Sequence, residues 1–103
     1  MSEWNKIAKV SAVPSGEKIA AKVGDTEVAV YNVGGTFFAT DNLCTHESAF
    51  LSDGWLEGEV IECPYHQARF DVKTGKVLAP PACKDLRTFP VRVSGDDVEV
   101  QVP

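Results

Sequence analysis

Short runs of alternating hydrophobic and polar residues make up most of this chain, with turn residues between them. The runs lie at residues 4–10, 18–23, 27–33, 36–40, 60–62, 69–72, 86–93 and 97–102. A period of two with β-branched residues is typical of strands, and no stretch keeps the 3.6-residue period of a long helix. The run at 18–23 is ambiguous by itself, and the run that follows it favours a strand. The pattern therefore predicts many short strands.

Turn signals support this interpretation. The pair Gly34-Gly35 predicts a tight hairpin turn, and residues 94–96 join the last two runs as a final hairpin. Residues 79–82 include two prolines, which cannot donate to a strand ladder, so we expect a stiff loop there. Many short strands with frequent turns are typical of an all-β sandwich or barrel. At 103 residues the chain has the length of one small domain, residues 1–103.

Both histidines and two of the three cysteines lie within one window of 23 positions. Cys44-Thr45-His46 is followed by Cys63-Pro64-Tyr65-His66, so each half offers one thiolate and one imidazole. These side chains bind borderline and soft metals well, but zinc fingers usually pair Cys with Cys and His with His. Mixed pairs suit a dinuclear cluster, because each loop can give one ligand to each iron. A mononuclear zinc site and a chance arrangement are the alternatives.

The window and its flanks resemble the Rieske [2Fe–2S] motif of the small ferredoxins of bacterial aromatic-ring dioxygenases, the naphthalene and biphenyl type. Residues 41–46 and 61–71 carry the resemblance, which extends over nearly the whole chain. It implies the Rieske fold, an antiparallel β-sandwich with a small cluster-binding subdomain inserted between strands. That part would span about residues 43–70, with a proline loop at about 79–82. The resemblance also implies one [2Fe–2S] cluster, held by Cys44, His46, Cys63 and His66.

Two features of the ligand set bear on the reduction potential. With two thiolates and two neutral imidazoles the oxidised cluster is uncharged, and it accepts an electron more readily than an all-cysteine cluster does. High-potential Rieske proteins carry an extra disulfide at positions that match Ala49 and Tyr65, neither of which can form it. Their hydroxyl donors are also missing, because Gln67 and Ala68 follow His66. We expect a potential near the low end of the Rieske range, about −150 mV.

The resemblance implies a one-electron carrier, not an enzyme. Electrons would come from an NADH-dependent flavoprotein ferredoxin reductase and go to a terminal Rieske non-haem-iron aromatic dioxygenase. After the four ligands no histidine remains for a second iron centre, and no G-x-G-x-x-G motif offers a nucleotide site. The alternatives are a small Rieske subunit of another redox enzyme, such as nitrite reductase, and a zinc-binding interaction module.

The net charge of −5 lies in the metal-bearing window. Residues 44–66 carry five acids and no Lys or Arg, whereas residues 1–43 have a net charge of −1 and residues 67–103 of +1. The net charge of −5 makes nucleic acid and acidic membranes poor partners. The concentration of acids in residues 44–66 is either an ordinary solvated face or a charged surface that steers this protein toward a basic patch on a redox partner. No signal peptide and no membrane-length apolar run is present, so we expect a cytoplasmic protein, by default a monomer.

Several further side chains have expected roles. An apolar collar beside a surface imidazole is one expected role for Phe50, Tyr65 and Pro81, and ordinary packing beneath the loops is the alternative. The proline loop is expected to cover the cluster. We interpret Trp4 and Trp55 as core residues. Cys83, the third cysteine, argues against a secreted disulfide scaffold and reads as a small buried hydrophobe.

Overall fold

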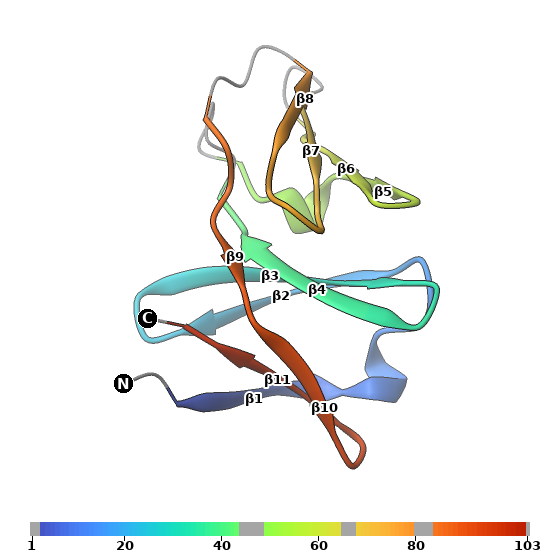
Figure 1. The fold of residues 1–103 in the computed structure, drawn as a ribbon, viewed down its shortest axis with the longest axis vertical. Helices are drawn as coiled ribbons and strands as arrows, with labels where there is room; N and C mark the ends of the chain where they lie inside the picture. The colour runs from blue at the N-terminus through green and yellow to red at the C-terminus, as the bar shows by residue number, and fades with distance from the viewer. Residues whose placement is uncertain (1–2, 44–48, 65–67, 80–83, 103) are drawn as a thin grey trace.

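Three antiparallel sheets, stacked as layers, form the part of the chain that the structure describes (Figure 1). The structure is a computed structural model, and it describes residues 3–43, 49–64, 68–79 and 84–102. We call the sheets the terminal, central and small sheets. The central sheet is the middle layer, with the terminal sheet on one side and the small sheet on the other.

The strands are distributed as follows. The terminal sheet consists of β1 (Trp4–Lys9), β11 (Asp97–Gln101) and β10 (Val91–Ser94), in that order. The central sheet consists of β2 (Lys18–Val23), β3 (Thr26–Val33), β4 (Thr36–Asp41) and β9 (Thr88–Phe89). The small sheet consists of β5 (Trp55–Glu57), β6 (Val60–Glu62), β7 (Arg69–Asp71) and β8 (Val77–Ala79). Two single-turn 3₁₀ helices complete the elements, η1 (Val10–Ala12) and η2 (Leu51–Asp53).

Strand β3 separates two hydrophobic cores. Val28 and Val30 pack in the cluster between the central and terminal sheets, whereas Ala29 and Tyr31 pack in the cluster that faces the small sheet. Successive side chains of a strand point to opposite faces, so a strand between two cores buries both sets. This explains why the run at 27–33 alternates only partly.

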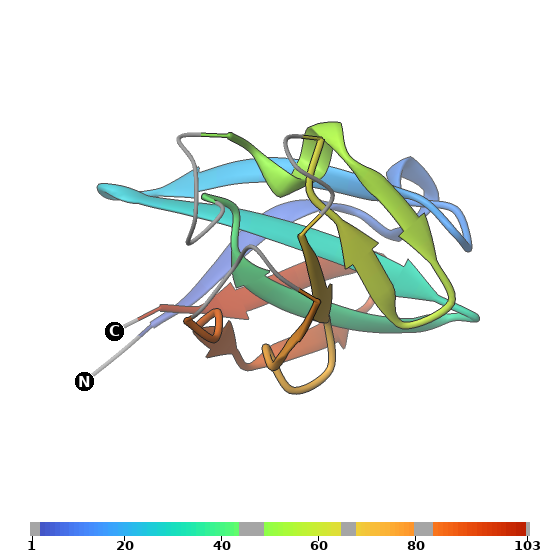
Figure 2. The ribbon, with the colours of Figure 1, turned by 90° about the horizontal axis from the view of Figure 1, so that it is seen from above.

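The small sheet is an insertion in the central sheet. Strands β4 and β9 are hydrogen-bonded neighbours, with Ala39 opposite Phe89, yet all four strands of the small sheet lie between them in the chain. The small sheet turns Leu56, Ile61 and Phe70 toward the core that it shares with β3. Seen from above, it lies over the central sheet (Figure 2). The predicted all-β sandwich with an inserted small subdomain is confirmed.

The details differ from the sequence predictions at three places. The single strand expected at 86–93 is two strands, β9 and β10, in different sheets, because Pro90 separates them and lacks an N–H for a ladder. Strand β8 was not predicted. The core position expected for Trp55 is wrong: its side chain lies at the edge of the small sheet and is 59% exposed. No helix in the described ranges is long and apolar enough to cross a membrane.

Candidate functional site

The first predicted ligand loop rises from the end of β4. Leu43 and Phe50 form an antiparallel bridge, and the Leu51 N–H donates to the Asn42 carbonyl at 2.7 Å. These two contacts join the chain on either side of residues 44–48. That segment includes Cys44 and His46 and lies outside the described residues. The first ligand pair is therefore predicted on a loop whose two ends are held together.

The Asn42 side chain strengthens this closure. It is fully buried, its Oδ1 accepts from the Ser52 N–H at 2.8 Å, and its Nδ2 donates to Ser52 Oγ at 3.0 Å. An amide side chain has both N–H donors and an oxygen acceptor, so Asn42 alone can bond the backbone N–H and the hydroxyl oxygen of Ser52. Asp41 and Asn42 were part of the motif that carried the resemblance, but this role was not predicted.

The second predicted ligand loop rises from the hairpin of β6 and β7. Glu62 is paired with Arg69 across the strands, and the Cys63 N–H donates to the Ala68 carbonyl at 2.7 Å. Tyr65, His66 and Gln67 lie outside the described residues. The Cys63 thiol is on the described side of this boundary, and the residue is completely buried.

One apolar cluster joins the two loop bases. Ala49 and Leu51 of the first loop pack in the same cluster as Cys63 and Ala68 of the second. The backbones also approach closely, because a side-chain carbon added at Gly54 would overlap the Glu62 carbonyl oxygen. Both predicted ligand pairs thus start from a single packed base.

A third segment begins beside the second loop. Ala79, at the end of β8, is paired with Arg69, and the chain continues into residues 80–83, which lie outside the described residues. The expected proline loop, its cover over the cluster and the expected burial of Cys83 all fall in that segment. Past the segment, the Leu86 N–H donates to the Gly75 carbonyl at 2.7 Å, so the chain returns to the small sheet.

Arg87 fixes this returning segment to the first loop. Its Nε and one terminal nitrogen donate to the two carboxylate oxygens of Asp41 at 2.9 and 2.8 Å, and the Asp41 N–H donates to the Arg87 carbonyl. The side-chain hydrogen bonds to Asp41, and next the charge attraction of Asp41, raise the pKa of Arg87. The pair links the end of β4, three residues before Cys44, to the chain that follows the third segment.

Of the four predicted ligands only Cys63 can be placed. A thiol at the base of a loop, buried among Ala49, Leu51 and Ala68, is an inert small hydrophobe unless a cation stabilises its thiolate form. A soft thiolate donor in an apolar surrounding suits iron, so the residues present fit a [2Fe–2S] group. No three His, Cys, Asp or Glu side chains within the described ranges gather as a metal site. The full set Cys44, His46, Cys63 and His66 stays a prediction.

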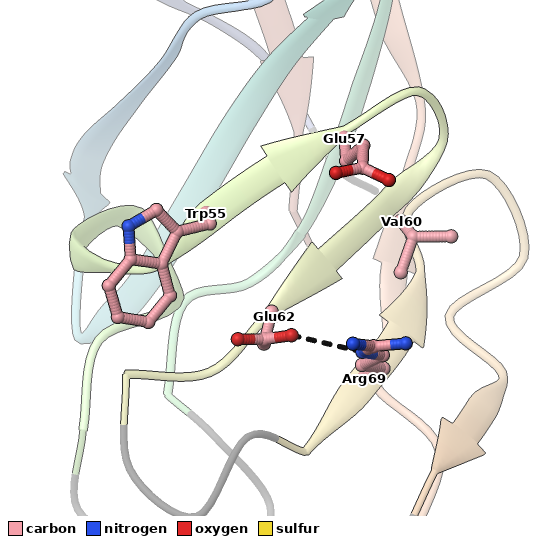
Figure 3. A pocket seen from close by; sticks show the side chains of 5 residues that line it. All are labelled: Trp55, Glu57, Val60, Glu62 and Arg69. Atoms are coloured by element: carbon pink, nitrogen blue, oxygen red, sulfur yellow. Dashed lines mark hydrogen bonds and ion pairs between the residues drawn. The ribbon is translucent and has the colours of Figure 1, made fainter.

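The outer face of the small sheet bears a hollow next to the second loop (Figure 3). Its volume is about 160 Å³, and it is lined by Trp55, Glu57, Val60, Glu62 and Arg69. Pockets for small organic ligands usually measure about 300–1,000 Å³. The hollow is therefore too small to enclose an aromatic substrate and is a shallow depression on the outer face of the small sheet.

Comparison with known proteins gives a consistent result. The Rieske [2Fe-2S] domain family matches residues 3–90. The ferredoxin component of the naphthalene 1,2-dioxygenase/salicylate 5-hydroxylase systems of Ralstonia sp is 51% identical over 90 residues, 87% of this chain and 86% of the relative. The biphenyl dioxygenase ferredoxin subunit of Pseudomonas sp. (strain KKS102) is 44% identical over 98 residues, 94% of this chain and 90% of the relative.

Solved structures agree with these relatives. A chain in the complex of reduced oxygenase and oxidised ferredoxin of carbazole 1,9a-dioxygenase is 41% identical with a TM-score of 0.89, over 94% of this chain and 91% of that one. A putative NADH-dependent nitrite reductase small subunit from Mycobacterium tuberculosis has a TM-score of 0.88 over 100% of this chain and 97% of that one, but only 19% identity. That second likeness extends to the fold alone.

Proposed function

The chain belongs to the Rieske [2Fe–2S] family, among the ferredoxin components of aromatic-ring dioxygenase systems, and on this premise we propose its place in an electron-transfer chain. It takes electrons one at a time from an NADH-dependent flavoprotein ferredoxin reductase. It delivers them to a terminal Rieske non-haem-iron aromatic dioxygenase. It acts as a monomer in the cytoplasm.

Four residues are proposed to hold the cofactor: Cys44 and His46 from the first loop, and Cys63 and His66 from the second. When bound, the [2Fe–2S] cluster supplies one electron that is taken up and released reversibly. The observation that supports this assignment most strongly is the common base of the two loops, where buried Cys63 packs with residues from both. A packed base keeps water away from the thiolate and holds the ligands in position.

Like its relatives, which are ferredoxin components, the chain is an electron-transfer component and not the catalytic oxygenase. Its residues therefore have two tasks, to keep the cofactor in place and to present a surface to each partner. A relative of this chain was solved together with its oxygenase, which supports the terminal oxygenase as one partner. The reductase is inferred from the same kind of system, since the sequence has no G-x-G-x-x-G motif with which the carrier could bind NADH itself.

Reconstitution tests this proposal. NADH, a naphthalene-dioxygenase-type reductase and the matching terminal oxygenase are combined with and without the purified ferredoxin, and NADH oxidation and aromatic diol formation are measured together. We expect both to depend on the ferredoxin and to be coupled. The Cys63→Ser variant is the control that should support neither. Failure of the wild-type protein to accept electrons from any such reductase, or its stable co-purification with a large nitrite-reductase subunit, would contradict the proposal.

A further inference from the structure

The small sheet has one face in the core and one face in solvent. Leu56 of β5, Ile61 of β6 and Phe70 of β7 are opposite one another and point into the core. Because side chains alternate along a strand, the neighbours of these residues point outward. The outward row closest to the ligand loops consists of Trp55, Glu62 and Arg69, which are paired in register across the three strands.

This row lies directly beside the second ligand loop. Glu62 immediately precedes Cys63, and Arg69 immediately follows Ala68, the residue whose carbonyl accepts from the Cys63 N–H. Trp55 is the cross-strand neighbour of Glu62, and paired residues in an antiparallel sheet have Cα atoms about 4.5–5.5 Å apart. A protein that contacts Trp55 is therefore within one strand spacing of Glu62, the residue that precedes Cys63.

Trp55 is unusually exposed for a residue of its size. The residue is 59% exposed, whereas Trp is on average highly buried because contact of its large apolar surface with water is unfavourable. It borders the hollow that also includes Glu57 and Val60, and Figure 3 shows its indole at one side of that hollow. Exposed aromatic residues beside a recess are the usual anchors of protein interfaces, where Trp is enriched among the energetically dominant residues.

The charges around the hollow indicate what it would receive. Arg69 Nε donates to Glu62 Oε1 at 3.0 Å, so Arg69 meets the charge of one of the three nearby glutamates. Glu57, at the rim of the hollow, and Glu59, in the following turn, are both exposed. A negative rim next to an aromatic face is complementary to an Arg or Lys side chain, which can stack on the indole while it pairs with a carboxylate.

We propose that Trp55 and Glu57, with the Glu62–Arg69 pair beside them, form a recognition surface for a basic side chain of the terminal oxygenase. This inference rests on the proposed function and names where that partner docks. The oxygenase is chosen because it is the partner with which a close structural relative assembles. The surface gives affinity through Trp55 and association rate through Glu57, and both act next to the second ligand loop.

The test compares Trp55→Ala, Trp55→Phe and Glu57→Gln with two matched controls from the far side of the molecule. Val93→Ala removes an exposed apolar side chain of the terminal sheet, and Asp96→Asn removes an exposed carboxylate from the β10–β11 turn. Each protein is first checked by its visible and EPR spectra for an intact cluster. Titration calorimetry with the purified oxygenase at two salt concentrations then gives Kd, and stopped-flow mixing of the dithionite-reduced ferredoxin gives the electron-transfer rate.

We expect Trp55→Ala to raise Kd on the order of tenfold, the loss typical of an aromatic interface anchor, and Trp55→Phe to retain part of the affinity. Glu57→Gln should slow association and make binding less sensitive to salt, while both controls stay within about twofold of wild type. A Trp55→Ala protein that binds the oxygenase as wild type does, or that loses only its reaction with the reductase, would overturn the inference. If wild type itself neither binds nor reduces the oxygenase, the proposed function fails instead.

Discussion

Asn42 and Ser52 are joined by two hydrogen bonds, from the Ser52 N–H to Asn42 Oδ1 at 2.8 Å and from Asn42 Nδ2 to Ser52 Oγ at 3.0 Å. Asn42 is fully buried and stands two residues before Cys44, the first predicted ligand. The pair therefore closes the first ligand loop from below. It adds to the Leu43–Phe50 bridge and the Leu51–Asn42 backbone hydrogen bond, which join the same two ends.

Replacement of Asn42 should weaken both the fold and the hold on the cofactor. Asn42→Ala leaves the part-buried Ser52 N–H without its acceptor, and it opens the base of the loop. A fully buried group of this kind costs about 1–3 kcal/mol, and the cost here should lie toward the lower end. We expect a lower free energy of unfolding and faster release of iron to a chelator. Iron release is followed by the loss of visible absorption.

Asn32→Ala is the matched control for this change. Asn32 is 6% exposed and also makes two side-chain hydrogen bonds, to the Val13 carbonyl and from the Gly35 N–H, but it lies at the β3–β4 hairpin. It should cost comparable stability without a specific effect on iron release under native conditions. Equal chelation rates for both variants would show that Asn42 has no particular role at the loop.

The Asp41–Arg87 pair is expected to hold the first ligand loop in place and to add little to the free energy of unfolding. The Arg87 side chain is 61% exposed, so the pair should contribute no more than about 1 kcal/mol, less at high salt. Arg87→Ala should nevertheless speed iron release, because it removes the side-chain link between the base of the first loop and the chain after residues 80–83 and leaves only backbone contacts at Arg87. Arg92→Ala breaks a similar exposed pair with Glu99 in the terminal sheet and serves as the control. The same chelation rate in both variants would contradict this role.

Buried Tyr31 makes the stability dependent on pH at the alkaline end. Desolvation raises the pKa of Tyr31 above its ordinary value of 10.0, while its hydrogen bond with Thr40 opposes this in part. The neutral phenol is therefore favoured in the folded state. The contribution is fully present below pH 10 and is lost as the pH rises further, since the unfolded chain then ionises first.

Urea unfolding of wild type and Tyr31→Phe at pH 8, 9.5 and 11 measures this contribution. At pH 8 and 9.5 the variant should be less stable by about 1 kcal/mol, the value of one hydrogen bond. At pH 11 the difference should shrink or reverse, because phenylalanine has no proton to lose. A constant difference at all three pH values would show that Tyr31 does not govern the alkaline loss of stability.

The reduction potential is expected to be low for this class of cluster. Ala49 and Ala68, at the positions that flank the two loops, are buried and carry no thiol or hydroxyl that could form a disulfide or donate to a cluster sulfur. We predict a midpoint near about −150 mV. A spectroscopic redox titration measures it directly, and a midpoint well above zero would mean that other donors stabilise the reduced state.

The sequence predicted individual strands and turns better than the sheet to which each strand belongs. Alternation and turn residues were enough for β3, the Gly34-Gly35 turn and the last hairpin, because these features are local. They could not predict that Pro90 divides one apparent strand between two sheets, since sheet membership depends on distant partners. The spacing of cysteine and histidine predicts the ligand set, which stays a prediction, and the structure adds how the base of the two loops is built.

The supports of the site were less visible in the sequence. Asp41 and Arg87 are 46 positions apart, and nothing in their local pattern indicates that they pair. Trp55 was misinterpreted because a large aromatic residue near Leu56 is usually part of a core. Its exposure became apparent only when strand register assigned it to the outer face of the small sheet.

The electron-carrier account is tested most directly by an EPR spectrum of the dithionite-reduced protein, with iron and acid-labile sulfide counted in the same sample. We predict two irons and two sulfides per chain and a spectrum of a [2Fe–2S] cluster with mixed nitrogen and sulfur ligands, which His46→Ala or His66→Ala abolishes. A colourless, iron-free protein from iron-replete anaerobic expression, or an unchanged spectrum in those variants, would contradict it.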